Sequence, residues 1–283
     1  MKKLIYTLAL SLAFASCEEP IDIEIPNGAN QMVVEGNIDI NDIARVTLSK
    51  SLGYFDPLDL NALSDLFITD AVVTLSDGNQ TENLTLFIDE NVFPPIFYQS
   101  SNIKGEINKS YTLNISWDNK EYSAKTHIVN PAPLDSVWFE LEDGEDSLGI
   151  IKFLYVDPDT IGNRFRVFTK RVGRDSYFVP SPLDLRYDII VNGETFESFV
   201  YRGQSLEDPE SDPERFYYKL GDTLILRWSS IDYDHFEFWR TLANNEGGNP
   251  FAAPVNVKSN IENGLGIWGG YASIYDTIVA KIE

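Results

Sequence analysis

The fold class is decided by residues 111–128, which read YTLNISWDNKEYSAKTHI. Large apolar residues occupy every second position of the segment 111–117, and polar residues lie between them. Such strict alternation is typical of an antiparallel strand that buries one face. Asp118 and Asn119 then form a two-residue turn into a second alternating run, residues 120–128. The segment therefore predicts a β-hairpin that lies against a hydrophobic core.

Similar short alternating runs recur on both sides of this hairpin, separated by turn residues, and they predict a mainly β protein. We expect residues 31–130 to form an immunoglobulin- or transthyretin-like β-sandwich. A proline-rich segment, residues 130–133, marks the domain boundary. Residues 131–283 are then expected to form a second antiparallel β domain, with a hairpin turn at Asn192-Gly193.

The second domain is also expected to contain one short helix. Apolar residues at helical spacing place it near residues 231–244, with Ser229 or Ser230 as its N-terminal cap. After the helix, a final pair of short strands is expected around residues 266–271 and 277–282.

The N-terminus has the arrangement of an export signal. Two lysines precede an apolar stretch that is shorter than the roughly 20 residues of a transmembrane helix, so residues 1–16 are predicted to be a signal peptide. Cys17, the only cysteine, follows in a segment that resembles the lipobox of bacterial lipoproteins. We expect Cys17 to be lipidated and residues 17–30 to act as a tether. The alternatives are an ordinary cleaved signal and a buried thiol.

Two acidic residues, Glu18 and Glu19, follow the cysteine directly. They resemble the acidic signal that sends lipoproteins of the Bacteroidota to the outer cell surface. The expected location is therefore the outer membrane, with a lipid anchor and with the protein facing the cell exterior. The alternative is that the two glutamates belong only to a solvated tether.

Composition excludes several classes of protein. The chain has 283 residues with 22 basic and 44 acidic side chains, a formal charge of −22, so nucleic acid is not an expected partner. Two histidines and one cysteine are too few for most zinc, haem and disulfide architectures. An apolar content of 43% is sufficient for a packed core and excludes a disordered chain.

A search for catalytic motifs finds little. Residues 264–269 match the dinucleotide pattern G-x-G-x-x-G, but no helix is expected after them, so no nucleotide is expected. His127 and His235 lie far apart in the sequence, and neither belongs to a zinc-binding motif. We expect no catalytic residue and no metal site. A pair of catalytic carboxylates leaves no sequence pattern, so an envelope hydrolase stays an alternative.

Acidic residues cluster in three predicted loops, residues 142–146, 157–159 and 207–214. We expect them to form a solvated acidic surface. Calcium bound by these loops is the alternative, although the spacing of an EF-hand is absent. No cofactor is expected.

Aromatic residues recur in the last quarter of the chain. Trp239, Trp268 and Tyr271 are the candidates for a binding platform, because aromatic rings stack on sugars and on partner proteins. Packing in the core is the alternative for aromatic residues that alternate along strands.

Segments spread over nearly the whole mature chain carry a family resemblance. They include CEEPID (17–22), MVVEG (32–36), VTLSKS (46–51), GGNPF (247–251) and SNIENGLG (259–266). These segments resemble the DUF4249 family of Bacteroidota lipoproteins. The biochemical function of that family is unassigned, so the resemblance transfers no functional residue. It implies similarity in kind to the lipoproteins found beside TonB-dependent outer-membrane receptors.

The expected function is therefore that of a non-catalytic lipoprotein that is accessory to a TonB-dependent receptor, through docking or through capture of its cargo. A stand-alone surface module that binds glycans or matrix is the first alternative, and an envelope hydrolase is the second. The expected partners are the outer membrane, through the N-terminal lipid, and a β-barrel receptor. Nucleic acids and nucleotides are not expected to bind.

Overall fold

The predicted hairpin is present in the computed structural model. Strand β7 (Ser110–Trp117) pairs antiparallel with β8 (Lys120–His127), and Trp117 lies opposite Lys120. The turn residues Asp118 and Asn119 have positive φ angles of 49° and 56°, as a two-residue hairpin loop requires. The structure describes residues 31–52, 65–89, 92–157, 162–187, 193–205, 208–209, 211–212, 214–246 and 256–282.

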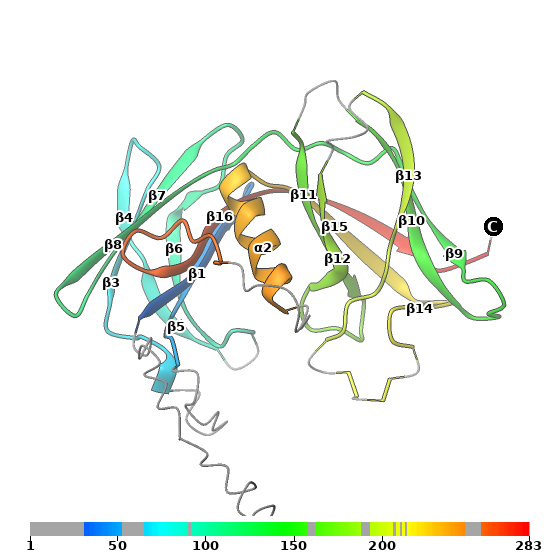
Figure 1. Ribbon diagram of the computed structural model, residues 1–283, viewed down its shortest axis with the longest axis horizontal. Coiled ribbons are helices and arrows are strands. Elements are labelled where there is room, and N and C mark those ends of the chain that lie inside the picture. The colour runs from blue at the N-terminus through cyan, green and yellow to red at the C-terminus, as the bar shows by residue number, and fades with distance from the viewer. Residues whose placement is uncertain are drawn as a thin grey trace, which may run out of the picture.

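The described strands form three sheets, so the prediction of a mainly β protein is confirmed (Figure 1). The largest sheet has eight strands in the order β12-β11-β15-β16-β1-β2-β6-β5. Its members are β1 (Met32–Asp39), β2 (Ile43–Lys50), β5 (Thr85–Ile88), β6 (Ile96–Lys104), β11 (Arg164–Arg171), β12 (Val179–Tyr187), β15 (Thr223–Ser230) and β16 (Leu265–Val279).

Each half of the large sheet faces a smaller sheet, which gives two β-sandwiches side by side. In the first sandwich the smaller sheet has the order β4-β3-β7-β8, with β3 at Val72–Ser76 and β4 at Thr81–Asn83. In the second, β10 pairs with β9 along one edge and with β13 and β14 along the other. These strands are β9 (Ser136–Leu141), β10 (Leu148–Val156), β13 (Thr195–Val200) and β14 (Tyr218–Lys219).

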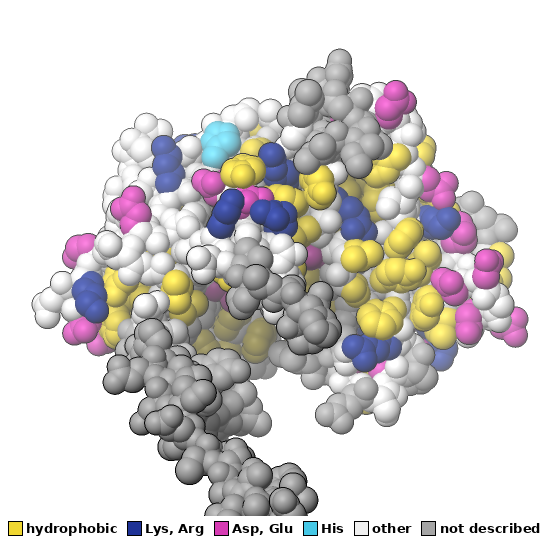
Figure 2. Space-filling view, in the orientation of Figure 1, with side chains coloured by type: hydrophobic (Ala, Val, Ile, Leu, Met, Phe, Trp, Pro, Cys, Tyr) yellow, Lys and Arg dark blue, Asp and Glu magenta, His cyan; other side chains and the backbone are white. Residues whose placement is uncertain are grey.

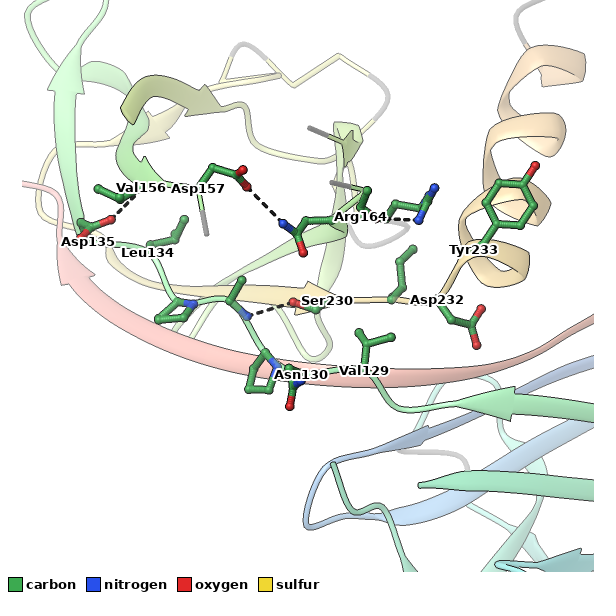
Figure 3. A pocket seen from close by; sticks show the side chains of 16 residues that line it. Val129, Asn130, Leu134, Asp135, Val156, Asp157, Arg164, Ser230, Asp232 and Tyr233 are labelled. Atoms are coloured by element: carbon green, nitrogen blue, oxygen red, sulfur yellow. Dashed lines mark hydrogen bonds between the residues drawn. The ribbon is translucent and has the colours of Figure 1, made fainter. Parts of the chain in front are cut away.

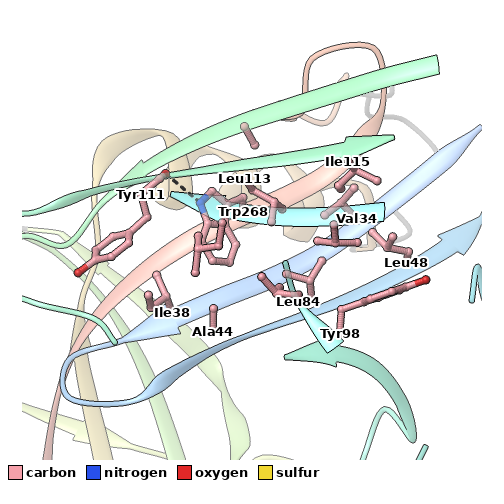
Figure 4. Close-up of a cluster of buried hydrophobic side chains, with 14 of the residues drawn as sticks. Val34, Ile38, Ala44, Leu48, Leu84, Tyr98, Tyr111, Leu113, Ile115 and Trp268 are labelled. Carbon is pink, nitrogen blue, oxygen red and sulfur yellow. Dashed lines mark hydrogen bonds between the residues drawn. The ribbon is translucent and has the colours of Figure 1, made fainter. Parts of the chain in front are cut away.

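Each sandwich has its own hydrophobic core around one tryptophan. In the first core, Trp268 is fully buried and its Nε1 donates to the carbonyl of Tyr111 over 3.1 Å (Figure 4). In the second core, the Trp228 ring lies 4.6 Å from the Phe165 ring and 5.1 Å from the Phe153 ring, centroid to centroid. Aromatic contacts of this kind add to the burial of apolar area that stabilises each core.

Strand β16 belongs to both sandwiches. Its residues 265–271 pair parallel with β1, and residues 272–279 pair antiparallel with β15. The predicted pair of short strands is therefore wrong, because the two segments form one continuous strand of 15 residues. Residues 265–271 also lie in the sheet of the first sandwich, so residues 31–130 do not build that sandwich alone. The predicted strand positions, residues 266–271 and 277–282, largely overlap this strand, but the prediction does not include residues 272–276, which join them.

The strands described on either side of the predicted hairpin turn at Asn192-Gly193 do not pair with each other. Strand β12, before that turn, pairs with β11 in the large sheet. Strand β13, after it, pairs with β10 in the opposite sheet. The two strands thus lie on different sides of the second core, and residues 188–192 lie outside the described residues.

The predicted helix is confirmed as α2 (Tyr233–Glu246), and it packs on the large sheet over β16, β11 and β12 (Figure 1). Its cap is not a serine, because Ser229 and Ser230 belong to β15. Instead, Oδ1 of Asp232 accepts from the backbone N–H of His235 over 2.8 Å, as an N-cap does. No helix in the described part of the chain has the length and apolar character needed to cross a membrane.

Ion pairs secure the outer side of the helix, where cationic and acidic side chains lie together (Figure 2). Glu237 accepts from Nε of Arg240 over 2.7 Å and from Nζ of Lys258 over 2.5 Å. These two hydrogen bonds lower the pKa of Glu237 to about 2. Lys258 also donates its backbone N–H to Thr241, so the segment before β16 is fastened to the helix.

The inner side of the helix depends on a glycine in β16. A Cβ atom at Gly269 would lie 2.3 Å from Cε1 of His235, whose ring is buried against the strand. The ring of His235 also packs edge-on against Tyr271, with 4.6 Å between ring centroids. Only a residue without a side chain at position 269 therefore lets the helix approach the sheet this closely.

We predict that Gly269→Ala lowers the free energy of unfolding by about 2 kcal/mol, because the added methyl group displaces the His235 ring. Urea denaturation measures this loss. The same substitution in a His235→Ala background should cost far less, since the clashing ring is gone. Equal losses in the two backgrounds would contradict the proposed contact.

Candidate functional site

A pocket of about 770 Å³ lies beside the linker that joins the two sandwiches (Figure 3). Its volume falls within the range of about 300–1,000 Å³ that is common for ligand sites. The wall is built from the linker, the end of β10, the start of β11 and the junction of β15 with α2. The lining residues are Val129–Asp135, Val156, Asp157, Gly162–Arg164 and Ser230–Tyr233.

The linker side of the pocket is held by hydrogen bonds at both ends. The backbone N–H of Ala132 donates to Oγ of Ser230 over 3.1 Å. Oδ2 of Asp135 accepts from the backbone N–H of Val156 over 2.7 Å. Pro131 and Pro133, on either side of Ala132, have no N–H group and favour an extended backbone. The linker is thereby fixed as one wall.

The carboxylates of the other walls hold the backbone as well. Asp157 is buried and accepts from the backbone N–H of Gly193 over 3.0 Å. Oδ2 of Asp232 accepts from the hydroxyl of Thr126 and from the backbone N–H of His127, so the cap of the helix also fastens strand β8. These carboxylates position the walls of the pocket.

Arg164 is the one cation among the described residues that line this pocket. It donates from one terminal nitrogen to the carbonyl of Gly162 over 2.6 Å, and its guanidinium lies 4.9 Å from the ring centroid of Tyr233. It forms no ion pair with any described residue. Figure 3 shows Arg164 on β11 and Tyr233 on the first turn of α2 facing each other.

The pocket therefore has features that suit ligand binding. Prolines, Leu134 and Ile231 supply apolar walls, and the remaining N–H groups of Arg164 supply hydrogen-bond donors. The ring of Tyr233 is 52% exposed and can stack on a planar or apolar group. These features suit a ligand with an apolar body and a carbonyl or hydroxyl oxygen that reaches Arg164.

Comparison with known proteins now gives the family. The profile of DUF4249, a domain of unknown function, matches residues 18–274. The chain belongs to the DUF4249 family. A search of the curated proteins finds no match.

The predicted aromatic platform does not form in this DUF4249 protein. Trp268 lies in the first core with no exposed surface, and Tyr271 is 5% exposed beneath the helix. Trp239 is half-buried, and the guanidinium of Arg166 lies 3.4 Å from its ring centroid. The assignment of Trp268 and Tyr271 to a binding surface is corrected, because the core encloses both rings, whereas Trp239 is partly exposed. Cys17, Glu18 and Glu19 lie outside the described residues.

The sequence does not distinguish Arg164 as a binding residue, and Tyr233 is only one of several late aromatic residues. Tyr233 was visible as one of the late aromatic residues, but its neighbour Arg164 lies 69 positions earlier on another element. Nothing in the local sequence of Arg164 distinguishes it from a surface arginine on a strand. Only the packing of α2 on the large sheet brings the two side chains together.

The described acidic residues of the third acidic loop do not form the solvated surface that the sequence predicts. Asp208 pairs with Arg171 over 2.8 Å and with Arg202 over 2.7 Å, and both arginines are almost fully buried. Burial alone would raise the pKa of Asp208, but the two guanidinium groups and the Ser205 N–H outweigh it, so this pKa lies below its usual value. Arg202 also pairs with Asp212.

Asp208 and Asp212 thus form structural ion pairs. Within the described ranges no group of three or more histidine, cysteine, aspartate or glutamate side chains is arranged to hold a metal ion. Pro158 and Asp159 of the second acidic loop lie outside the described residues.

His235 makes the stability of the protein depend on pH. Burial lowers the pKa of its imidazole from 6.5 to about 4, and the nearby charges of Arg166 and Arg227 act in the same direction, while Asp232 opposes them. At pH values between about 4 and 6.5, the ring is therefore neutral in the folded protein but protonated in the unfolded chain. Stability is fully present above pH 6.5 and is lost as the pH falls towards 4.

We predict that the free energy of unfolding falls by on the order of 3 kcal/mol between pH 6.5 and pH 4. Urea denaturation at a series of pH values measures the slope. His235→Gln should flatten this slope, and His127→Gln, at a histidine that lies partly exposed on β8, is the matched control. An unchanged slope in His235→Gln would exclude this imidazole as the cause.

Proposed function

We propose that this DUF4249 protein is a non-catalytic, lipid-anchored lipoprotein of the outer membrane that captures cargo for a TonB-dependent β-barrel receptor. The observation that carries the proposal is the open pocket in which Arg164 has N–H donors that no described side chain accepts, beside the exposed ring of Tyr233. The pocket carboxylates hold backbone groups, which supports binding at this site rather than acid–base chemistry.

The sequence supports the location. Residues 1–16 have the features of a signal peptide, and Cys17 follows them in a segment that resembles a lipobox. Glu18 and Glu19 support exposure at the cell exterior. The large excess of acidic side chains disfavours self-association of the domains outside the membrane.

The accessory role is tested by purification of the tagged full chain from native membranes in a mild detergent. We expect mass spectrometry to identify one outer-membrane β-barrel in stoichiometric amount. Cys17→Ser should release the chain from the membrane fraction, because the lipid is its anchor. Recovery of only the free chain would contradict the accessory role and favour the stand-alone binding module.

The pocket is tested on the same preparation by native mass spectrometry, which detects a bound small molecule as added mass. We expect Arg164→Ala and Tyr233→Ala to remove that mass, and Arg215→Ala, an exposed arginine elsewhere, to retain it. Wild-type protein without added mass would contradict cargo capture in this pocket. Turnover that disappears with one carboxylate would instead favour the envelope hydrolase.

A further inference from the structure

A second cavity, of about 330 Å³, lies on the outer face of the large sheet. Side chains of β1, β2, β15 and β16 form its floor, and residues from loops of both sandwiches form its walls. We call it the inter-sandwich chamber, and it shares no lining residue with the pocket in Figure 3. Its lining residues are Glu35, Asn37, Asp39, Asp42, Ile43, Arg45, Thr47, Val92–Pro94, Phe97, Phe178, Arg227 and Tyr275.

Aromatic rings from both sandwiches line the chamber. Phe93, in the loop before β6, is 61% exposed and lies 6.0 Å from the ring of Tyr177 in the second sandwich. The ring centroids of Phe178 and Tyr275 lie 5.7 Å apart, and Tyr275 is 55% exposed. Aromatic faces that stay exposed on two sides of a cavity can stack on a ligand held between them.

The floor presents three polar side chains that form no hydrogen bond or ion pair with another described side chain. Glu35 and Asn37 project from β1, and Arg45 lies directly opposite Asn37 on β2. All three are exposed. None makes a side-chain hydrogen bond or ion pair with another described residue, although Arg45 stacks 5.1 Å from the ring centroid of Phe97. Among the described residues, the amide, the carboxylate and the guanidinium thus have no hydrogen-bonding partner, and a ligand can bind them.

Two further charges of the floor, those of Arg227 and Asp39, pair with each other. Arg227 donates to Oδ2 of Asp39 over 3.0 Å and to the hydroxyl of Ser273 over 3.0 Å. The charges of Arg227 and Asp39 cancel, and so do those of Glu35 and Arg45. Asp42 then leaves a small excess of negative charge in the chamber. This charge pattern disfavours a phosphate or an acidic ligand, which needs an excess of donors and positive charge.

We propose that the inter-sandwich chamber binds a neutral saccharide. Hydroxyl groups of a sugar both donate and accept, so they match the free amide, carboxylate and guanidinium groups of the floor. The apolar C–H face of a sugar ring matches the exposed rings of Phe93 and Tyr275. The volume suits a short part of a chain rather than a large ligand. This proposal does not depend on cargo capture in the first pocket.

The test uses the full chain in a detergent without a sugar headgroup, because a glycosidic detergent would compete for the chamber. The probes are cellohexaose, xylohexaose, mannohexaose and laminarihexaose, with hexagalacturonate as the acidic comparison. Isothermal titration calorimetry measures binding. We expect at least one neutral hexasaccharide to bind and hexagalacturonate to bind more weakly or not at all.

Asn37→Ala and Phe93→Ala should each weaken that binding about tenfold, through loss of a hydrogen-bonding group and of a stacking ring. Both side chains are exposed, so the temperature of thermal unfolding should not change. A thermal unfolding measurement therefore distinguishes a loss of binding from a loss of folding. Asn114→Ala and Phe216→Ala are matched controls, since both residues are exposed outside the chamber, and they should retain affinity.

Failure of all four neutral probes to bind would overturn the proposal. Tighter binding of hexagalacturonate would overturn the neutral class, and affinity that survives both Asn37→Ala and Phe93→Ala would overturn the assignment to this chamber. These outcomes are distinct from a failure of cargo capture in the first pocket. That failure is measured by native mass spectrometry of wild type, Arg164→Ala and Tyr233→Ala.

Discussion

The parallel pairing of β1 with β16 is the contact on which the two-sandwich arrangement depends. Through it, residues 265–271 complete the sheet of the first sandwich, and the same strand continues as residues 272–279 into the second. Trp268 fills the first core while Ile274 and Ile278 pack against the second. Because a strand is stiff over this length, the two cores are held in one fixed relation, and the cavities beside and between them keep their shape.

The helix and the first pocket follow from the same strand. Gly269 admits the ring of His235, and this seats α2 across the middle of the large sheet. The cap residue Asp232 then reaches strand β8 of the first sandwich, so the start of the helix is bonded to both halves of the molecule. With the helix in that place, the ring of Tyr233 meets Arg164 at the pocket.

What sequence alone predicts, and what it does not, has a clear physical basis. The hairpin at 111–128 was predictable because each residue of its strands has a fixed face, so local alternation reports burial. Strand β16 was predicted only as two separate strands, and its parallel pairing with β1 was not predicted, because local alternation carries no information about a partner at the other end of the chain. Asp208 looked solvated for the same reason, since its partners Arg171 and Arg202 come from other segments.

Peptide-resolved hydrogen exchange in increasing urea tests most directly whether β16 couples the two sandwiches. If it does, β2 and β7 of the first sandwich and β11 and β15 of the second should open with the same free energy and the same urea dependence. Amides of both cores would then report one cooperative transition. Opening of one sandwich while the other stays protected would contradict the account, because a shared central strand cannot leave one sheet and remain intact in the other.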